Sequence, residues 1–226
     1  MQITEVSALG VRSTVTVFSH GSTPLRFVLI PTIHIGRPDY YRRIAERLTR
    51  CQLIVAEGYD GPSSTGMAYV TALRLTLRVR GRRLVHQDID YEALGVPIVW
   101  PDEPVLVGRR RRLPLWGWLD LVLMVPFLTF TMAVGGNDWL LHRNLEISDD
   151  SEPRMRWSVL HKMMLDDRDD QLVAALTRIH EERKGQAMDV GVVYGAAHFP
   201  AVVQALVGRL GYRPERGGEW LVAIDL

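Results

Sequence analysis

Residues 189–200, DVGVVYGAAHFP, place a histidine just beyond a short apolar run. The apolar run from Val190 to Tyr194 predicts a buried strand. Gly195 and the two alanines after it predict a tight turn that delivers His198 at the carboxyl end of this strand. Ligands of open α/β sheets bind at the carboxyl ends of the strands. His198 is therefore a candidate site residue.

Two other apolar runs end on groups that suit a functional site. Residues 25–30, LRFVLI, are followed by His34, and residues 52–56, QLIVA, are followed by Glu57. An amphipathic helix is predicted between these runs, with a proline in its first turn. Strand, helix and strand in this order predict two parallel strands with a right-handed connection. The sequence thus predicts that two histidines and one carboxylate share an edge of the sheet.

The whole chain predicts an α/β fold with a mixed, mainly parallel sheet flanked by helices. Alternating residues in 3–11 and 13–18 predict an N-terminal β-hairpin, with His20 as an exposed residue of the following turn. Residues 219–226 predict a closing strand. The charged run 166–171, DDRDDQ, is interpreted as a solvated turn between two helices.

Size and composition favour one domain over residues 1–226. A chain of 226 residues, 47% of them hydrophobic, can bury one sizeable core. Its 27 basic and 26 acidic residues give no field that favours nucleic acid. The single cysteine, Cys51, excludes an internal disulfide, and we expect it to be a small buried residue at a helix end. These features are compatible with a monomer or an oligomer.

A helical apolar insertion is predicted at about 105–150. Residues 113–134 approach the roughly 20 apolar residues that a bilayer requires, and four arginines, 109–112, precede them. A single span would put His34 and His198 on opposite sides of the membrane. Two alternatives keep them together: a buried helical pair, which is favoured, or a helix that contacts a membrane surface or partner. The N-terminus lacks the pattern of a signal peptide, so we expect a protein of the cytoplasm or of the cytoplasmic membrane face.

Imidazole and carboxylate groups suit Mn, Co or Zn ions, which activate water or polarise a carbonyl group. A hydrogen-bonded structural role for each histidine is an equal alternative on the residues alone.

Several motifs of the chain resemble those of the TraB/TIKI family, which is related to EreA-like and ChaN-like proteins. The resemblance rests on segments in the family's order: 27–36 FVLIPTIHIG, 53–58 LIVAEG, 166–173 DDRDDQLV and 192–200 VVYGAAHFP. It covers roughly the first and last 60 residues, and the middle matches only loosely, through Gln87 and Asp102. The family includes pheromone-shutdown proteins and Wnt-inactivating enzymes, and its members share two Gly-x-x-His motifs and a glutamate.

The resemblance implies a metal-dependent hydrolase, in particular a peptidase, that acts on a peptide or a small molecule. It implies metal ligands at His34, His198 and Glu57 and catalytic roles for Glu57 and Arg168, with Gly195, Gln87 and Asp169 as further site residues. The alternative is a non-catalytic module that binds haem or a peptide, or a membrane-associated regulatory module, on the same fold. One position departs from the family: Pro31 stands where glycine is usual. Because proline fixes φ and lacks an N–H, we expect an altered approach of backbone to substrate.

Overall fold

The computed structural model describes residues 2–7, 10–58, 85–87, 89–101, 126, 130 and 158–225. For residues 35, 86 and 158–167 only the backbone is described. The chain divides into two compact units, one of Met1–Gly58, Gln87–Glu103 and Arg154–Leu226, the other of Tyr59–His86 and Pro104–Pro153. The predicted insertion at 105–150, with its arginines and apolar run, lies outside the described residues except for 126 and 130. Asp102 lies outside them as well.

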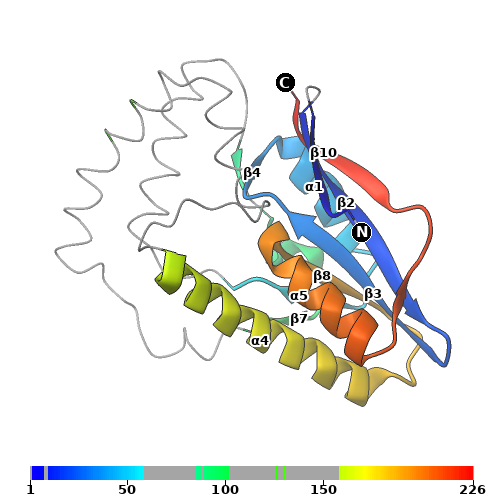
Figure 1. The fold of residues 1–226 in the computed structure, drawn as a ribbon. Coiled ribbons are helices and arrows are strands. Elements are labelled where there is room, and N and C mark those ends of the chain that lie inside the picture. Colours follow the sequence, from blue (N-terminus) through cyan, green and yellow to red (C-terminus); the bar gives the residue numbers. More distant parts are fainter. Residues whose placement is uncertain are drawn as a thin grey trace. The chain divides into compact units, whose positions relative to one another are not determined.

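The first unit is built on a mixed sheet (Figure 1). Its main path runs β1 (Thr4–Ser7), β2 (Gly10–His20), β3 (Thr23–Thr32), β8 (Asp189–Gly195), β5 (Leu53–Ala56) and β7 (Ile98–Val99). Strands β9 (Arg213–Pro214) and β10 (Glu219–Asp225) also pair with β2. The pairs along β3, β8, β5 and β7 are parallel, whereas β1, β3, β9 and β10 are antiparallel to β2. The α/β class, the mainly parallel sheet with flanking helices and the N-terminal hairpin are confirmed.

Strand β8 lies between β3 and β5, the two strands that were predicted to be connected by a helix. It pairs with β3 up to Thr32 opposite Gly195 and with β5 up to Ala56 opposite Val193. Val190, Val192 and Val193 are fully buried, as expected for a central strand of a covered parallel sheet. Strands β3 and β5 are therefore parallel, as predicted, but are not neighbours. The three strands end side by side.

Helix α1 (Pro38–Leu48) lies between β3 and β5 in the chain and has a proline in its first turn, as predicted. It buries Tyr40, Tyr41, Ile44 and Leu48. A Cβ atom at Gly191 would lie 2.9 Å from the Leu48 side chain and 3.2 Å from that of Cys51, so the glycine permits this close approach. Cys51 is buried and free, as predicted.

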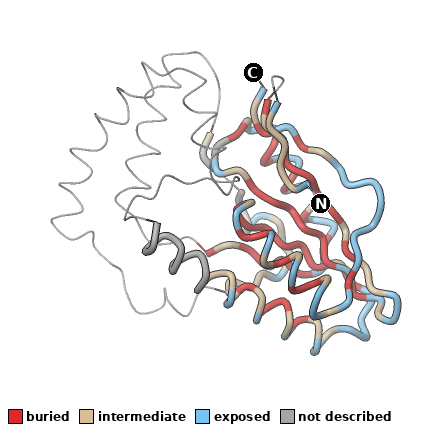
Figure 2. Tube along the Cα trace, in the orientation of Figure 1, coloured by how far each residue is buried: buried red, intermediate tan, exposed pale blue. Residues whose placement is uncertain are grey.

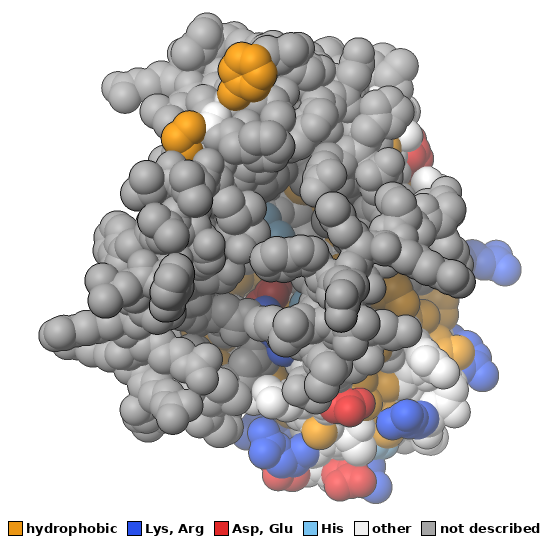
Figure 3. Space-filling view, turned by 60° about the vertical axis from the view of Figure 1, so that its left-hand side comes forward, with side chains coloured by type: hydrophobic (Ala, Val, Ile, Leu, Met, Phe, Trp, Pro, Cys, Tyr) orange, Lys and Arg blue, Asp and Glu red, His pale blue; other side chains and the backbone are white. Residues whose placement is uncertain are grey.

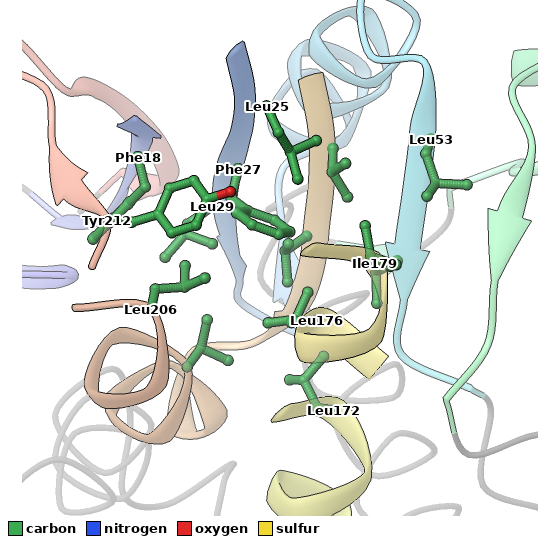
Figure 4. Close-up of a cluster of buried hydrophobic side chains, with 14 of the residues drawn as sticks. Phe18, Leu25, Phe27, Leu29, Leu53, Leu172, Leu176, Ile179, Leu206 and Tyr212 are labelled. Carbon is green, nitrogen blue, oxygen red and sulfur yellow. The ribbon is translucent and has the colours of Figure 1, made fainter. Parts of the chain in front are cut away.

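Helix α4 (Ser158–Arg183) is continuous through residues 166–171, so the predicted turn there was wrong. Leu172, Leu176 and Ile179 recur at helical spacing and are buried against the sheet (Figure 4). Burial of this apolar face stabilises the helix. Charged residues on its other faces are compatible with a helix, so the helix continues through the charged run. Val190 and Val192 belong to this core while Gly191 faces α1, which places α4 and α1 on opposite faces of β8.

After β8 the chain forms a 3₁₀ turn, η4 (Ala196–His198), the short helix α5 (Phe199–Gln204) and a π-helical turn, η5 (Ala205–Arg209). Helix α5 packs beside α4 (Figure 1). Gly211, which follows this turn, has φ +77°, a left-handed conformation that glycine adopts readily. The closing strand is β10. The remaining described elements are β4 (Ile35–Gly36), β6 (Val85–His86) and η1 (Glu92–Leu94).

Buried segments follow the central strands and the sheet-facing sides of the helices (Figure 2). Among the described residues, no helix is both long enough and apolar enough to cross a membrane.

Candidate functional site

Glu57 follows β5 and is the centre of a polar cluster at the strand ends. Its Oε2 accepts a hydrogen bond from the backbone N–H of Gly195 at 2.7 Å, and its Oε1 lies 2.9 Å from Nη2 of Arg168. The same Oε1 is 3.7 Å from Nε2 of His198. Both carboxylate oxygens are therefore engaged, and the side chain is only 12% exposed. In the space-filling view, acidic, basic and histidine side chains lie together near the middle of one face (Figure 3).

Arg168 reaches the cluster from α4. Its Nη2 also donates to the carbonyl oxygen of Gly58 at 3.3 Å. The guanidinium thus bridges a carboxylate and the backbone just after β5. Additional hydrogen bonds of this kind are what a largely buried ion pair requires to offset desolvation.

His198 is buried at the end of the 3₁₀ turn. Its Nδ1 lies 2.6 Å from Oδ1 of Asp169, the neighbour of Arg168 on α4. Because an ionised carboxylate only accepts hydrogen bonds, Nδ1 carries the proton and Nε2 is directed to Glu57. The ring also packs edge-on against Tyr194, with centroids 5.6 Å apart. Asp169 therefore fixes the orientation of His198.

His34 follows β3 and is exposed. Its Nδ1 lies 3.2 Å from Oε1 of Gln87, and its carbonyl oxygen accepts from the Gln87 N–H at 2.7 Å. An amide oxygen accepts, so Nδ1 donates to it. A Cβ atom at Gly195 would lie 3.2 Å from Nε2 of this histidine and 3.4 Å from Oε2 of Glu57. The space beside Gly195 is thus shared by His34 and Glu57.

Two tyrosines of α1 hold the chain that leads to His34. The Tyr40 hydroxyl lies 3.1 Å from the Pro31 carbonyl oxygen, and the Tyr41 hydroxyl donates to the Ile33 carbonyl oxygen at 2.7 Å. Pro31 lies beyond Leu29, the last residue of β3 paired with β2. The missing N–H of Pro31 therefore removes no hydrogen bond between β3 and β2.

The cluster shifts the pKa values of Glu57 and His198 in opposite directions. Burial raises the pKa of Glu57, but the His198 hydrogen bond, the charges of His34 and Arg168 and the Gly195 N–H outweigh it and lower the pKa to about 2. Burial lowers the pKa of His198, and hydrogen bonds to Glu57 and Asp169 outweigh it, so the net shift is upward. Glu57 is therefore ionised at neutral pH and is a weak base, which suits a ligand or counter-ion better than a proton acceptor.

The donor types of the cluster fit a divalent ion. In each histidine a side-chain oxygen fixes Nδ1, the arrangement that orients metal-ligating imidazoles. Two imidazole nitrogens and a carboxylate also form a recurrent ligand set. Against this, Arg168 already neutralises Glu57, and in the described part of the chain no group of three or more His, Cys, Asp or Glu side chains has the arrangement of a metal site.

The structure brings together every site residue that the sequence singled out: His34, Glu57, Gln87, Arg168, Asp169, Gly195 and His198. Sequence reasoning missed Tyr91, which lies near Gln87 and Glu57. It also missed that the α1 tyrosines hold the backbone before His34. Neither feature follows from a motif.

His20 and His180 form a second histidine pair outside this cluster, next to Tyr212. The ring centroids of the two histidines are 6.4 Å apart, and Nδ1 of His180 lies 3.0 Å from the Tyr212 hydroxyl. His20 ends β2 and its Nδ1 accepts from the Ser22 N–H at 3.1 Å, so it is a packed strand-end residue rather than the exposed turn residue expected.

Comparison of the chain with known protein families, curated proteins and solved structures finds no match.

Proposed function

We propose that the protein is a hydrolase that cleaves an amide or peptide bond with the help of a divalent metal ion. One observation supports this most directly. His34 and His198, each fixed through Nδ1 by a side-chain oxygen, lie at the ends of two adjacent parallel strands and flank the carboxylate of Glu57. The likeness of these segments to the TraB/TIKI family supports the same proposal.

His34 and His198, through Nε2, and Glu57 are the residues that would hold the ion. When bound, Mn, Co or Zn polarises a carbonyl group and makes water more acidic. Gln87 and Asp169 bond Nδ1 of the two imidazoles, so Nε2 is the nitrogen that would bind the ion once it has lost its proton. Glu57 serves as a ligand rather than a general base because its pKa is about 2.

Arg168 has two effects in this proposal. Its positive charge keeps Glu57 ionised, and it offers charge stabilisation to an oxyanion that develops nearby. Gly195 leaves open the space that a side chain would fill between His34 and Glu57. We further propose that the protein works in the cytoplasm or at the cytoplasmic face of a membrane.

A second candidate function is non-catalytic binding of haem or a peptide at the same residues. The observation that favours it is the engagement of Glu57, whose oxygens already accept from Arg168 and from the Gly195 N–H. An ion would have to share this carboxylate with a guanidinium.

Metal content separates the two candidates. The wild type and a His34→Ala, His198→Ala double variant are loaded with Mn, Co or Zn, desalted and subjected to elemental analysis. The matched control is a His20→Ala, His180→Ala variant, which removes the same number of histidines outside the cluster. We expect about one ion per chain in the wild type and control, and none in the site variant.

Hydrolysis is then tested with a peptide library. Metal-dependent cleavage that the site variant loses and the control keeps supports the hydrolase. Equal metal content in all three proteins, or cleavage that survives in the site variant, contradicts it. Haem or peptide binding without cleavage favours the second candidate.

A further inference from the structure

Arg168 binds two oxygen atoms that could otherwise face a metal ion. Its Nη2 lies 2.9 Å from Oε1 of Glu57 and donates to the Gly58 carbonyl oxygen at 3.3 Å. The side chains of Arg168 and Glu57 are only 18% and 12% exposed, so solvent and salt screen their attraction little. Carboxylate and carbonyl oxygens are also ligands that suit a divalent ion such as Mn²⁺. The guanidinium therefore occupies groups that an ion would use.

The Glu57 oxygen that Arg168 contacts is also the one that faces His198. Oε1 lies 3.7 Å from Nε2 of His198, whereas Oε2 accepts from the Gly195 N–H at 2.7 Å. An ion that takes both Nε2 of His198 and Glu57 as ligands therefore meets the guanidinium at Oε1. A carboxylate oxygen can accept more than once, but two positive charges this close together repel each other where water is scarce. The guanidinium and the ion thus weaken each other's binding to Glu57.

We propose that Arg168 is a built-in competitor of the divalent ion: the guanidinium holds Glu57 in the metal-free protein, and binding of the ion displaces it from Oε1. This inference rests on the proposed function and concerns the regulation of the same site. The competition keeps the metal-free cluster balanced in charge and lowers its metal affinity, because the ion has to replace an existing ion pair. By linkage, a change that weakens the contact between Arg168 and Glu57 strengthens binding of the ion.

The test is a Co²⁺ titration of Arg168→Met, a variant that lacks the charge and the donors of the guanidinium. We expect its dissociation constant to be about 5-fold or more below that of the wild type, which is the lower end of typical coupling between two ligands. Arg168→Lys keeps a positive charge and should stay closer to the wild type. The control is Arg178→Met, an exposed arginine of the same helix, which should bind Co²⁺ as the wild type does. Equal or weaker affinity in Arg168→Met would overturn the inference, because Arg168 would then only orient Glu57.

A second readout uses the wild type and does not depend on the folding of Arg168→Met. Protein labelled with ¹⁵N at arginine is titrated with Zn²⁺, and the guanidinium signals of Arg168 are assigned by their loss in Arg168→Lys. Hydrogen bonds to Glu57 and Gly58 hinder rotation of the guanidinium. We therefore expect separate Nη1 and Nη2 signals in the metal-free protein, and we expect them to merge at saturating Zn²⁺. Signals that stay separate at saturation would overturn the inference.

Failure of the inference and failure of the proposed function give different results. If the wild type and Arg168→Met bind the ion equally well, the metal site stands and the competition is refuted. If Arg168→Met binds the ion more tightly but no protein cleaves a peptide, the competition stands and the hydrolase is refuted. If neither protein binds an ion, both are refuted.

Discussion

Two histidine pairs in the described part of the chain, His34 with His198 and His20 with His180, differ in how closely carboxylates approach them. His198 lies against Asp169 and Glu57, and these acids raise its pKa. His180 bonds the Tyr212 hydroxyl, and burial, with smaller contributions from Lys184 and His20, lowers its pKa. The surroundings of His198 thus favour a positively charged imidazole, whereas those of His180 disfavour it. The carboxylates of Glu57 and Asp169 are what set the first pair apart.

The largest change in stability is expected when the positive charge beside Glu57 is removed. Arg168→Met leaves a largely buried carboxylate without its closest counter-charge, 2.9 Å away in the wild type. We expect a loss of about 3 to 5 kcal/mol in the free energy of unfolding. Chemical denaturation measures it, with Arg178→Met, an exposed arginine on the same helix, as the control that should stay within about 0.5 kcal/mol. A small loss in both variants would show that His198 alone balances Glu57.

The pH dependence of stability tests the carboxylate itself. The pKa of Glu57 is lowered from 4.5 to about 2, so its contribution is present above pH 4.5 and is lost as the pH falls toward 2. A difference of this size corresponds to on the order of 3 kcal/mol. We expect the unfolding free energy of Glu57→Gln, measured in chelator, to fall less steeply than that of the wild type between pH 5 and 2.

The control for that experiment is Glu46→Gln. Glu46 is an exposed residue of α1 whose carboxylate lies 3.9 Å from Arg42. Its removal should leave the acid profile of the wild type nearly unchanged, because exposed ion pairs contribute little. Identical profiles for Glu57→Gln and the wild type would contradict the assigned pKa shift.

Gly195→Ala tests whether the space between His34 and Glu57 is needed for the metal site, because it fills that space. The new methyl group would lie 3.4 Å from Oε2 of Glu57, an ordinary contact, and 3.2 Å from Nε2 of His34, so the exposed His34 ring has to shift by a few tenths of an ångström. We expect a cost of about 1 kcal/mol in unfolding free energy and weaker metal retention. Gly185→Ala is the matched control, since nothing lies within 4 Å of its added methyl group. Wild-type metal retention in Gly195→Ala would separate this space from the metal site.

The sequence was sufficient to locate the strand ends, because apolar runs before His34, Glu57 and His198 carry the signal by themselves. It could not place β8 between the other two strands, since strand order depends on long-range pairing. Nor could it show that α4 continues through residues 166–171: charged residues suit a turn and a polar helix face equally well, and the packing of Leu172 and Leu176 decides between them.

The family resemblance named Gln87 and Asp169 as site residues, but the sequence could not show which histidine each of them contacts. Only the fold brings Gln87 to His34 and Asp169 to His198.

The smallest expected effect concerns how each histidine pair is supported. Tyr41→Phe removes the hydrogen bond to the Ile33 carbonyl oxygen, next to His34, and Tyr212→Phe removes the bond to His180. Each should cost about 1 kcal/mol in unfolding free energy. The two variants should differ in function, however, because Tyr41 holds the backbone that carries a site histidine whereas Tyr212 holds a histidine outside the cluster. We therefore expect metal affinity, measured by Co²⁺ titration, to fall several-fold in Tyr41→Phe only. Equal affinities in the two variants would mean that Gln87 alone suffices to position His34.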